Sequence, residues 1–378
     1  MKIWIERQRS LIDFTVAGLL RRKVRNLGLM AVYSCVVFIL ATVMLFTHSL
    51  RKEASVLLSD APEITVQRVI MGRHALIEHT DLDVVSKIRG ARHARGRLWG
   101  YFYDTANGAN YTLMVPDKVH TIKQGQVQIG AGVARARDLK KGKFLFLTTN
   151  RGKLFKLQVS GILSTESELV SSDLVLMSEQ DYRNFFRLPS NVYTDLVLNV
   201  RNSREVTKIA EKISAVLPDS RVITRDDILR TYESLFSWRE GILLALLGGA
   251  LCSFIIFAWD KTSGLSASER QEIGILKAVG WETSDILTMK LWESVLISLG
   301  AFLFAYTLAY LHVFYFSAGL LEPVLKGWAI LYPQFHLTPE VDPLQVMTLL
   351  FFTVFPYVAA TLVPIWRAAI IDPDTVMR

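Results

Sequence analysis

Four long segments without any Asp, Glu, Lys or Arg constrain this chain more than any other feature. They are Asn26–Leu50, Gly241–Trp259, Ser294–Leu321 and Pro343–Trp366. An α-helix needs about 20 mainly apolar residues to cross the hydrocarbon core of a bilayer. Hydrophobic residues make up 51% of the 378 residues, and the mean hydropathy is +0.29. The pattern predicts four membrane-spanning helices and excludes a wholly soluble protein.

The basic residues predict the orientation of these helices. Lys and Arg exceed Asp and Glu by 43 to 35. They are dense in residues 1–25 and recur in 260–290, whereas residues 321–342 hold a single one, Lys326. Cytoplasmic loops of membrane proteins carry the excess of basic residues. We therefore expect both termini and the 260–290 loop in the cytoplasm, and we attribute the net charge of +8 to topology rather than to nucleic acid.

This topology divides the chain into nine segments with an α-helical membrane part and one large extracytoplasmic domain. The first window is too long for the apolar region of a cleaved signal peptide, which usually has about 7–15 residues. The expected segments are a cytoplasmic amphipathic helix (1–25), transmembrane helix 1 (26–50), the extracytoplasmic domain with helical stalks (51–239), transmembrane helix 2 (240–260), a cytoplasmic loop (261–290), transmembrane helix 3 (291–321), an extracytoplasmic loop (322–342), transmembrane helix 4 (343–366) and a cytoplasmic tail (367–378).

The 51–239 block has the pattern of a mixed α+β domain. Both cysteines, Cys35 and Cys252, lie in predicted spans, so the domain must fold without disulfides. Helical periodicity is present in His79–Ile88 and Arg204–Val216. Strands are expected at Glu63–Ile70, Leu98–Asp104, Tyr111–Val115, Lys143–Leu147, Leu154–Val159, Leu174–Met177 and Tyr193–Val200. We expect two subdomains, with no sequence signal that places their boundary.

Two clusters in this domain have a structural and a functional interpretation. The basic stretch 89–97 could bind an anionic lipid or partner, but a solvated loop beside a strand is the favoured interpretation. The alternating aromatic residues Trp99, Tyr101 and Tyr103 could line a substrate path, but a core stripe is more common. The seven histidines have no ligand-like spacing, so we expect no metal site.

Several kinds of chemistry lack their usual motifs. No GxxxxGK[ST] phosphate loop, GxSxG, HExxH or CxxC occurs. Ion-coupled carriers keep ionisable residues at membrane depth, and the windows hold no Asp, Glu, Lys or Arg and two histidines, His48 near the end of the first window and the candidate His312. We expect a non-catalytic membrane subunit without a cofactor of its own, driven by energy that a partner supplies.

Three motifs resemble one known family. The run Glu269-Arg270-Gln271-Glu272-Ile273-Gly274-Ile275-Leu276-Lys277-Ala278-Val279-Gly280 resembles the cytoplasmic signature of FtsX-like permeases, the membrane subunits of MacB/LolC-type ABC transporters. Residues 19–25 (LLRRKVR) resemble the basic helix before the first span in that family. Residues 364–369 with Asp372-Pro373 resemble its C-terminal ending, and the 51–239 block is similar to the MacB-type periplasmic core domain.

The resemblance implies a mechanotransmission permease in a bacterial inner membrane. ATP and Mg would be bound by two copies of a separate ABC ATPase, and a second permease chain, identical or homologous, would complete the complex. An envelope adaptor or lipoprotein partner is compatible with it. The implied ATPase-coupling residues are Glu269, Arg270, Glu272, Ile273, Gly274, Ile275, Leu276, Lys277 and Gly280.

Three functions remain open at this point. The first is a permease that moves or extracts a lipid, lipoprotein, peptide or hydrophobic small molecule in the cell envelope. The second is an ATP-driven signalling scaffold that controls an extracytoplasmic enzyme such as a cell-wall hydrolase. The third is an ATP-independent membrane receptor, under which the cytoplasmic motif of residues 269–280 would have no role. The sequence does not identify the cargo or its direction of movement.

Overall fold

The structure is a computed structural model in which the chain forms two compact units, each described by itself below. The helical unit holds residues 1–49, 237–318 and 338–378, and the α+β unit holds residues 50–236 and 319–337. The structure describes residues 2–59, 61–117, 122–149, 151–164, 168–231, 234, 241, 245–250, 252–253, 255–256, 267–323, 330–332 and 337–370.

The helical unit contains long apolar helices preceded by a shorter one. Its described helices are α1 (Lys2–Arg21), α2 (Lys23–Ser59, which continues into the α+β unit), α9 (Ala267–Ala278), α10 (Thr283–Tyr310, extended by the π-helical turn η3, Leu311–Tyr315) and α12 (Pro343–Ile370). Among the described residues, three helices are long and apolar enough to cross a membrane: Lys23–Glu53, Thr283–Tyr315 and Pro343–Thr361. Much of the predicted second span, 240–260, lies outside the described residues.

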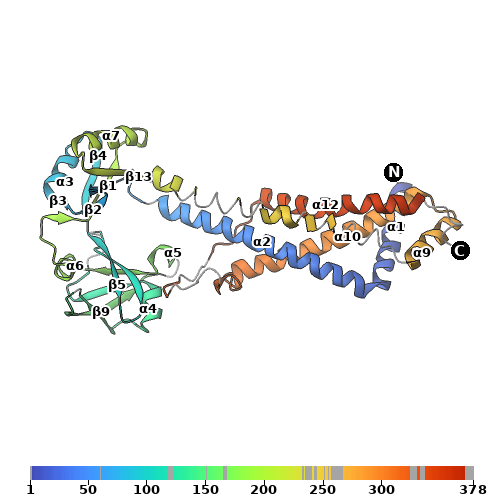
Figure 1. The fold of residues 1–378 in the computed structure, drawn as a ribbon, viewed down its shortest axis with the longest axis horizontal. Helices are drawn as coiled ribbons and strands as arrows, with labels where there is room; N and C mark the ends of the chain where they lie inside the picture. Colours follow the sequence, from blue (N-terminus) through green and yellow to red (C-terminus); the bar gives the residue numbers. More distant parts are fainter. Residues whose placement is uncertain are drawn as a thin grey trace. The chain divides into compact units, whose positions relative to one another are not determined.

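Polar side chains inside the bundle bond to neighbouring helices. The Ser34 hydroxyl of α2 donates to the carbonyl of Ala301 in α10 at 3.3 Å, and the rings of Tyr33 and Tyr357 meet edge to face at 5.4 Å between α2 and α12. In an apolar medium a hydroxyl without a partner costs free energy. These contacts join α2 to both later helices, which run beside each other (Figure 1).

The α+β unit is built on two main sheets, and this resolves the two expected subdomains. One sheet has the strand order β13-β1-β12-β4, with β2 paired to β1. Its strands are β1 (Ile64–Ile70), β2 (Arg73–Ala75), β4 (Ala91–Arg97), β12 (Asp195–Val200) and β13 (Ser220–Thr224). Helices α3 (His79–Ser86) and α7 (Val206–Val216) pack their buried apolar residues against it. We call this part the five-stranded lobe.

The second sheet has the order β5-β6-β10-β7-β9-β8 and forms what we call the six-stranded lobe. Its strands are β5 (Trp99–Asp104), β6 (Ala109–Met114), β7 (Gln126–Ile129), β8 (Phe144–Thr148), β9 (Leu154–Ile162) and β10 (Leu174–Met177). Helices α4 (Ala131–Ala136), α5 (Glu168–Ser171) and α6 (Glu179–Phe186) belong to the same lobe (Figure 1). A separate two-stranded ribbon pairs β3 (Ile77–Glu78) with β11 (Val192–Tyr193).

Two interpretations of the sequence are wrong in this unit. The aromatic stripe of β5 is not core, because Tyr101 and Tyr103 are 72% and 56% exposed while Phe102, on the opposite face, is buried. The period of two fixes which residues share a face of a strand but not which face is covered. The basic stretch is also not a loop: Ala91–Arg97 is the edge strand β4, and edge strands tolerate charged side chains.

A buried ion pair holds the crossing between the two lobes. The Arg97 guanidinium donates from Nε and Nη2 to the Asp195 carboxylate at 2.8 and 2.7 Å, and Trp99 Nε1 donates to the same carboxylate at 2.9 Å. Asp195 is fully buried. Close by, Gly96 faces the Tyr193 ring so closely that a Cβ on residue 96 would lie 2.2 Å from it. Segments of both sheets are thus fixed to each other at this crossing.

We expect Asp195→Ala to destabilise the α+β unit strongly. The substitution leaves the half-buried Arg97 without its carboxylate, and breaking such a pair typically costs about 3–5 kcal/mol. Urea unfolding of a fragment spanning residues 51–239, which we expect to fold alone, measures the loss. Asp117→Asn is the matched control, since it removes the exposed partner of Arg95 on the same strand, and such pairs contribute about 0–1 kcal/mol. Equal losses in the two variants would contradict this assignment.

Candidate functional site at the junction of helices α1, α9 and α10

Helix α9 contains the family-like motif and ends at a glycine. Gly280 has φ of +102°, and the amide of Trp281 donates to the carbonyl of Leu276 at 3.0 Å. A left-handed residue directly after a helix closes its last turn, and glycine adopts this conformation without a steric penalty. No atom lies within 4 Å of a Cβ built on Gly280. Its role is therefore to terminate the helix rather than to permit a close backbone approach.

The two sides of α9 differ. Ile273 is buried and forms a small apolar cluster with Ile286 at the start of α10. Ile275 and Val279, one helical turn apart, are 51% and 75% exposed. Residues four apart lie on the same face of a helix. One side of α9 thus packs on the bundle, and the other presents an apolar pair to the surroundings.

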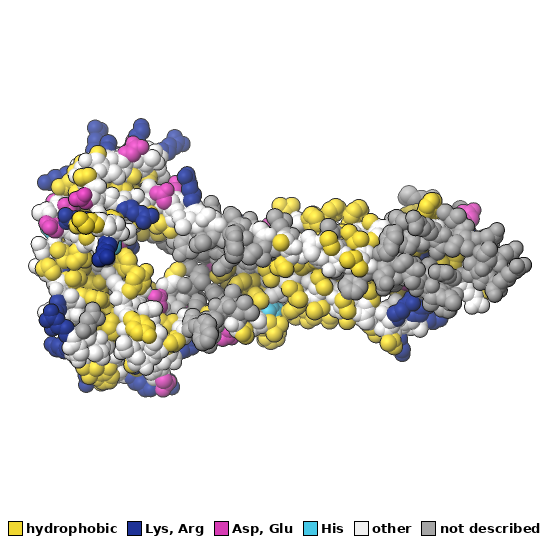
Figure 2. Space-filling model, viewed as in Figure 1, with side chains coloured by type: hydrophobic (Ala, Val, Ile, Leu, Met, Phe, Trp, Pro, Cys, Tyr) yellow, Lys and Arg dark blue, Asp and Glu magenta, His cyan; other side chains and the backbone are white. Residues whose placement is uncertain are grey.

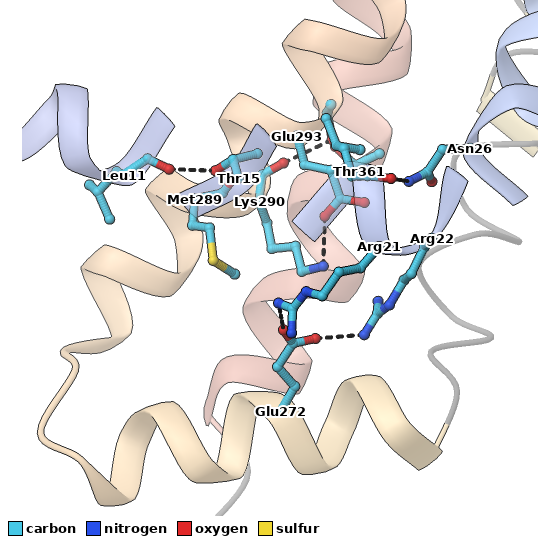
Figure 3. A network of polar contacts seen from close by, with 12 residues as sticks. Leu11, Thr15, Arg21, Arg22, Asn26, Glu272, Met289, Lys290, Glu293 and Thr361 are labelled. Carbon is cyan, nitrogen blue, oxygen red and sulfur yellow. Dashed lines mark hydrogen bonds and ion pairs between the residues drawn. The ribbon is translucent and has the colours of Figure 1, made fainter. Parts of the chain in front are cut away.

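Glu272 binds the two arginines at the end of the first helix. Its carboxylate accepts from Arg21 Nη2 at 2.9 Å and from Arg22 Nη2 at 2.5 Å (Figure 3). Arg21 is the last residue of α1, where a positive charge is favoured by the helix dipole, and Arg22 lies in the break before α2. The expected single helix over residues 1–25 is divided at this point. Partly exposed pairs contribute at most about 1 kcal/mol, so Glu272 orients α9 more than it stabilises the fold.

Helix α1 lies along the first half of α10. The Thr15 hydroxyl donates to the carbonyl of Met289 at 3.3 Å, and the rings of Phe14 and Trp281 lie 5.3 Å apart. The flanking contacts are polar: Arg7 with Asp285 at 2.5 Å, and Trp292 Nε1 with the Gln8 side chain at 2.9 Å. The sequence predicted an amphipathic helix here but gave no signal for these partners.

Further along α10, polar side chains are buried where the uncharged window Ser294–Leu321 begins. The Lys290 ammonium lies 2.7 Å from the Glu293 carboxylate, and both side chains are largely buried. One turn further, the Ser294 hydroxyl donates to Thr361 of α12 at 3.0 Å. Because Glu293 lies one helical turn from Lys290, the two opposite charges are buried in the bundle as an ion pair (Figure 3).

The junction encloses little space. A cavity of about 30 Å³ lies among Arg22, Asn26, Glu272, Lys290 and Glu293, which is room for about one water molecule. In the described part of this junction, the close approach of α1, α9 and α10 is a contact between helices.

The nine predicted coupling residues have different surroundings. The structure brings Glu272 and Ile273 onto the bundle and leaves Ile275 exposed, while Leu276 and Lys277 are half-buried and Gly274 is buried. The side chains of Glu269 and Arg270 lie outside the described residues. The role of these residues in coupling stays a prediction. Arg21, Arg22 and Asp285 were not among them, because the sequence alone does not show which helices they contact.

Comparison with known proteins gives one family match and one curated relative. Residues 242–373 match the family model described as FtsX-like permease C-terminal. An uncharacterized ABC transporter permease of Methanocaldococcus jannaschii is 25% identical over 183 residues, which cover 45% of this chain. The match spans 44% of that relative, less than half of its length.

Two solved structures show weak similarity. The periplasmic region of MacB from Actinobacillus actinomycetemcomitans is 13% identical, with a TM-score of 0.32, over 45% of this chain and 92% of that one. The extracellular domain of the ABC-type transporter YknZ from Gram-positive bacteria is 12% identical, with a TM-score of 0.30, over 43% of this chain and 99% of that one.

We expect Glu272→Lys to loosen α9 from the bundle. The new ammonium is repelled by Arg21 and Arg22, and a loss of roughly 1 kcal/mol makes the amides of α9 exchange about fivefold faster. Hydrogen exchange of peptides from residues 267–278 in the detergent-purified chain measures this. Glu282→Gln is the control, because Glu282 is an exposed acid 4.0 Å from Arg7. Unchanged exchange in Glu272→Lys would show that the pair does not hold α9.

Proposed function

We propose that this chain is an FtsX-like permease of an ABC transporter, as the match of residues 242–373 to the C-terminal permease model and the one permease relative support. In this role it converts ATP hydrolysis by a separate ATPase subunit into movement of an extracytoplasmic domain. The work performed is the movement or extraction of a lipid, lipoprotein, peptide or hydrophobic small molecule in the cell envelope. The chain itself is a non-catalytic subunit.

The observation that carries this proposal is the two-sided helix α9. An amphipathic helix can place an apolar face into a groove of another protein, as in other helix-in-groove contacts. Ile275 and Val279 form such a face, while Ile273 and Glu272 tie the opposite side to α10 and to the end of α1. A displacement of α9 by a bound partner is thereby passed to α10, one of the candidate spans.

The composition of the complex follows from this role. Two ATPase subunits carry ATP and Mg, and a second permease chain, identical or homologous, pairs with this one. Both termini and α9 lie on the cytoplasmic side of a bacterial inner membrane, and the α+β unit lies outside. The excess of basic residues in segments 1–25 and 260–290 supports this orientation. An envelope adaptor or lipoprotein could complete the system.

A signalling scaffold is the second function that we retain. It uses the same α9 contact and the same movement but controls an extracytoplasmic enzyme such as a cell-wall hydrolase. Two separate pairs of exposed aromatic residues favour retaining this function: Tyr101 with Tyr103 on the edge strand β5, and Phe144 with Phe146 on the opposite edge strand β8. Exposed apolar groups of this kind suit contact with another protein.

We expect Ile275→Asp and Val279→Asp to reduce retention of the ATPase at least about tenfold. Each substitution places a charge where an apolar side chain would enter the partner's groove, and central apolar anchors contribute much of the binding energy of an interface. Purification of the tagged chain in detergent with ATP, followed by mass spectrometry of the retained proteins, measures the effect. No P-loop ATPase with the unsubstituted chain would contradict the proposed function.

A matched control separates this effect from a general effect of charge. Val216→Asp makes the same change at a valine of α7 that is 51% exposed, as Ile275 is. It should retain the ATPase fully. Equal loss in Val216→Asp would mean that the variants fail for reasons other than the α9 contact.

A further inference from the structure

Between α10 and α12, residues 330–332 pack on the six-stranded lobe. Residues 319–337 belong to the α+β unit, although the helices before and after them belong to the helical unit. Leu331 packs against the apolar core of the six-stranded lobe. Ile330 reaches the β5–β6 turn, where a Cβ on Gly108 would lie 3.4 Å from its Cδ1. We call the described residues of this segment, 319–323, 330–332 and 337, the tether.

A preorganised arginine holds the backbone of the tether. Arg135 Nη2, on α4, donates to the carbonyl of Tyr332 at 2.9 Å. The same guanidinium forms an ion pair with Glu168 of α5, which is almost fully buried. Because Glu168 fixes the guanidinium, little rotamer freedom remains to be lost in the bond to the tether. This bond is charge-assisted and therefore stronger than one between neutral groups.

The phenol of Tyr332 also lies in a partly desolvated place. Burial, together with the negative charge of Glu322, raises the pKa of Tyr332 to about 12. Both residues are part of the tether, so the described part of this segment has packing of its own. Leu331, Ile330 and Tyr332 thus provide an apolar and a polar attachment to the same lobe.

We propose that the tether is the route by which a displacement of α10 and α12 reaches the six-stranded lobe, with Arg135 and Leu331 as positioning residues. This inference rests on the proposed function. Helix α2 leads directly into β1, so the five-stranded lobe receives a separate input. The Arg97–Asp195–Trp99 contacts fix the two lobes at their crossing. Different displacements arriving through α2 and through the tether therefore rotate the whole α+β unit and do not separate its two sheets.

The first arm of the test measures docking of the tether without ATP. Arg135→Lys keeps a cation near Glu168 but loses the guanidinium fork, and Leu331→Ser removes the apolar contact. Hydrogen exchange of peptides from residues 319–337 in the full-length chain in detergent should be about tenfold faster in both variants. Arg183→Ala, on α6 of the same lobe, is the control, because Arg183 likewise binds a glutamate, Glu179, and backbone carbonyls, those of Pro189 and Val192. Unchanged exchange in both tether variants would overturn the proposed docking.

The second arm measures transmission in the complex with the co-purified ATPase. We expect ATP to change the exchange of residues 99–114 in the unsubstituted complex. In Arg135→Lys and Leu331→Ser, most of this change should be lost, while ATP hydrolysis and the response of β1 and β13 persist. Tether variants that respond fully would overturn the route. An unsubstituted complex without any response to ATP would overturn the proposed function and the route with it, whereas the first arm would still report whether the tether docks.

Discussion

The absence of water in the hydrocarbon core is the constraint on which the rest of this structure depends. A backbone there must satisfy its own hydrogen bonds, and a single helix does so without help from other segments. The apolar spans of α2, α10 and α12 are helical, and Pro356 within α12 has no amide to donate to the preceding turn. Two of their hydroxyl groups, those of Ser34 and Ser294, bond to a neighbouring helix, whereas others, such as those of Ser298 and Thr353, bond to a carbonyl of their own helix. Contacts of this kind hold neighbouring helices to one another along part of their length.

Near the start of α10, helix α9 is held by both ion pairs and an apolar contact. Glu272 fixes the direction of the helix through Arg21 and Arg22, and Ile273 supplies the apolar seat against Ile286. The other side of the helix exposes Ile275 and Val279. The residues that seat α9 on the bundle and those that are exposed therefore do not overlap.

The sequence predicted local structure better than the partners of individual side chains. The strands β8 and β9 and the helix α7 follow from alternation and helical spacing, and the structure confirms them. The covered face of β5 did not follow, since alternation is the same whichever side is buried. Nor did the pairing of Glu272 with residues 250 positions earlier, because the packing of α1 on α10 has no local signal. Long-range partners are decided by tertiary packing, which one sequence does not encode in any short pattern.

The close approach of Gly96 to Tyr193 limits how this protein can change over evolutionary time. The ring of Tyr193 occupies the volume that any side chain on residue 96 would need. An alanine at this position is therefore acceptable only if residue 193 becomes smaller first. Among homologous chains with this crossing of the lobes, the two positions should vary together, with glycine facing an aromatic ring or a larger residue facing a smaller one. Covariation of residues 96 and 193, which are far apart in sequence, would therefore identify the place where the two lobes meet.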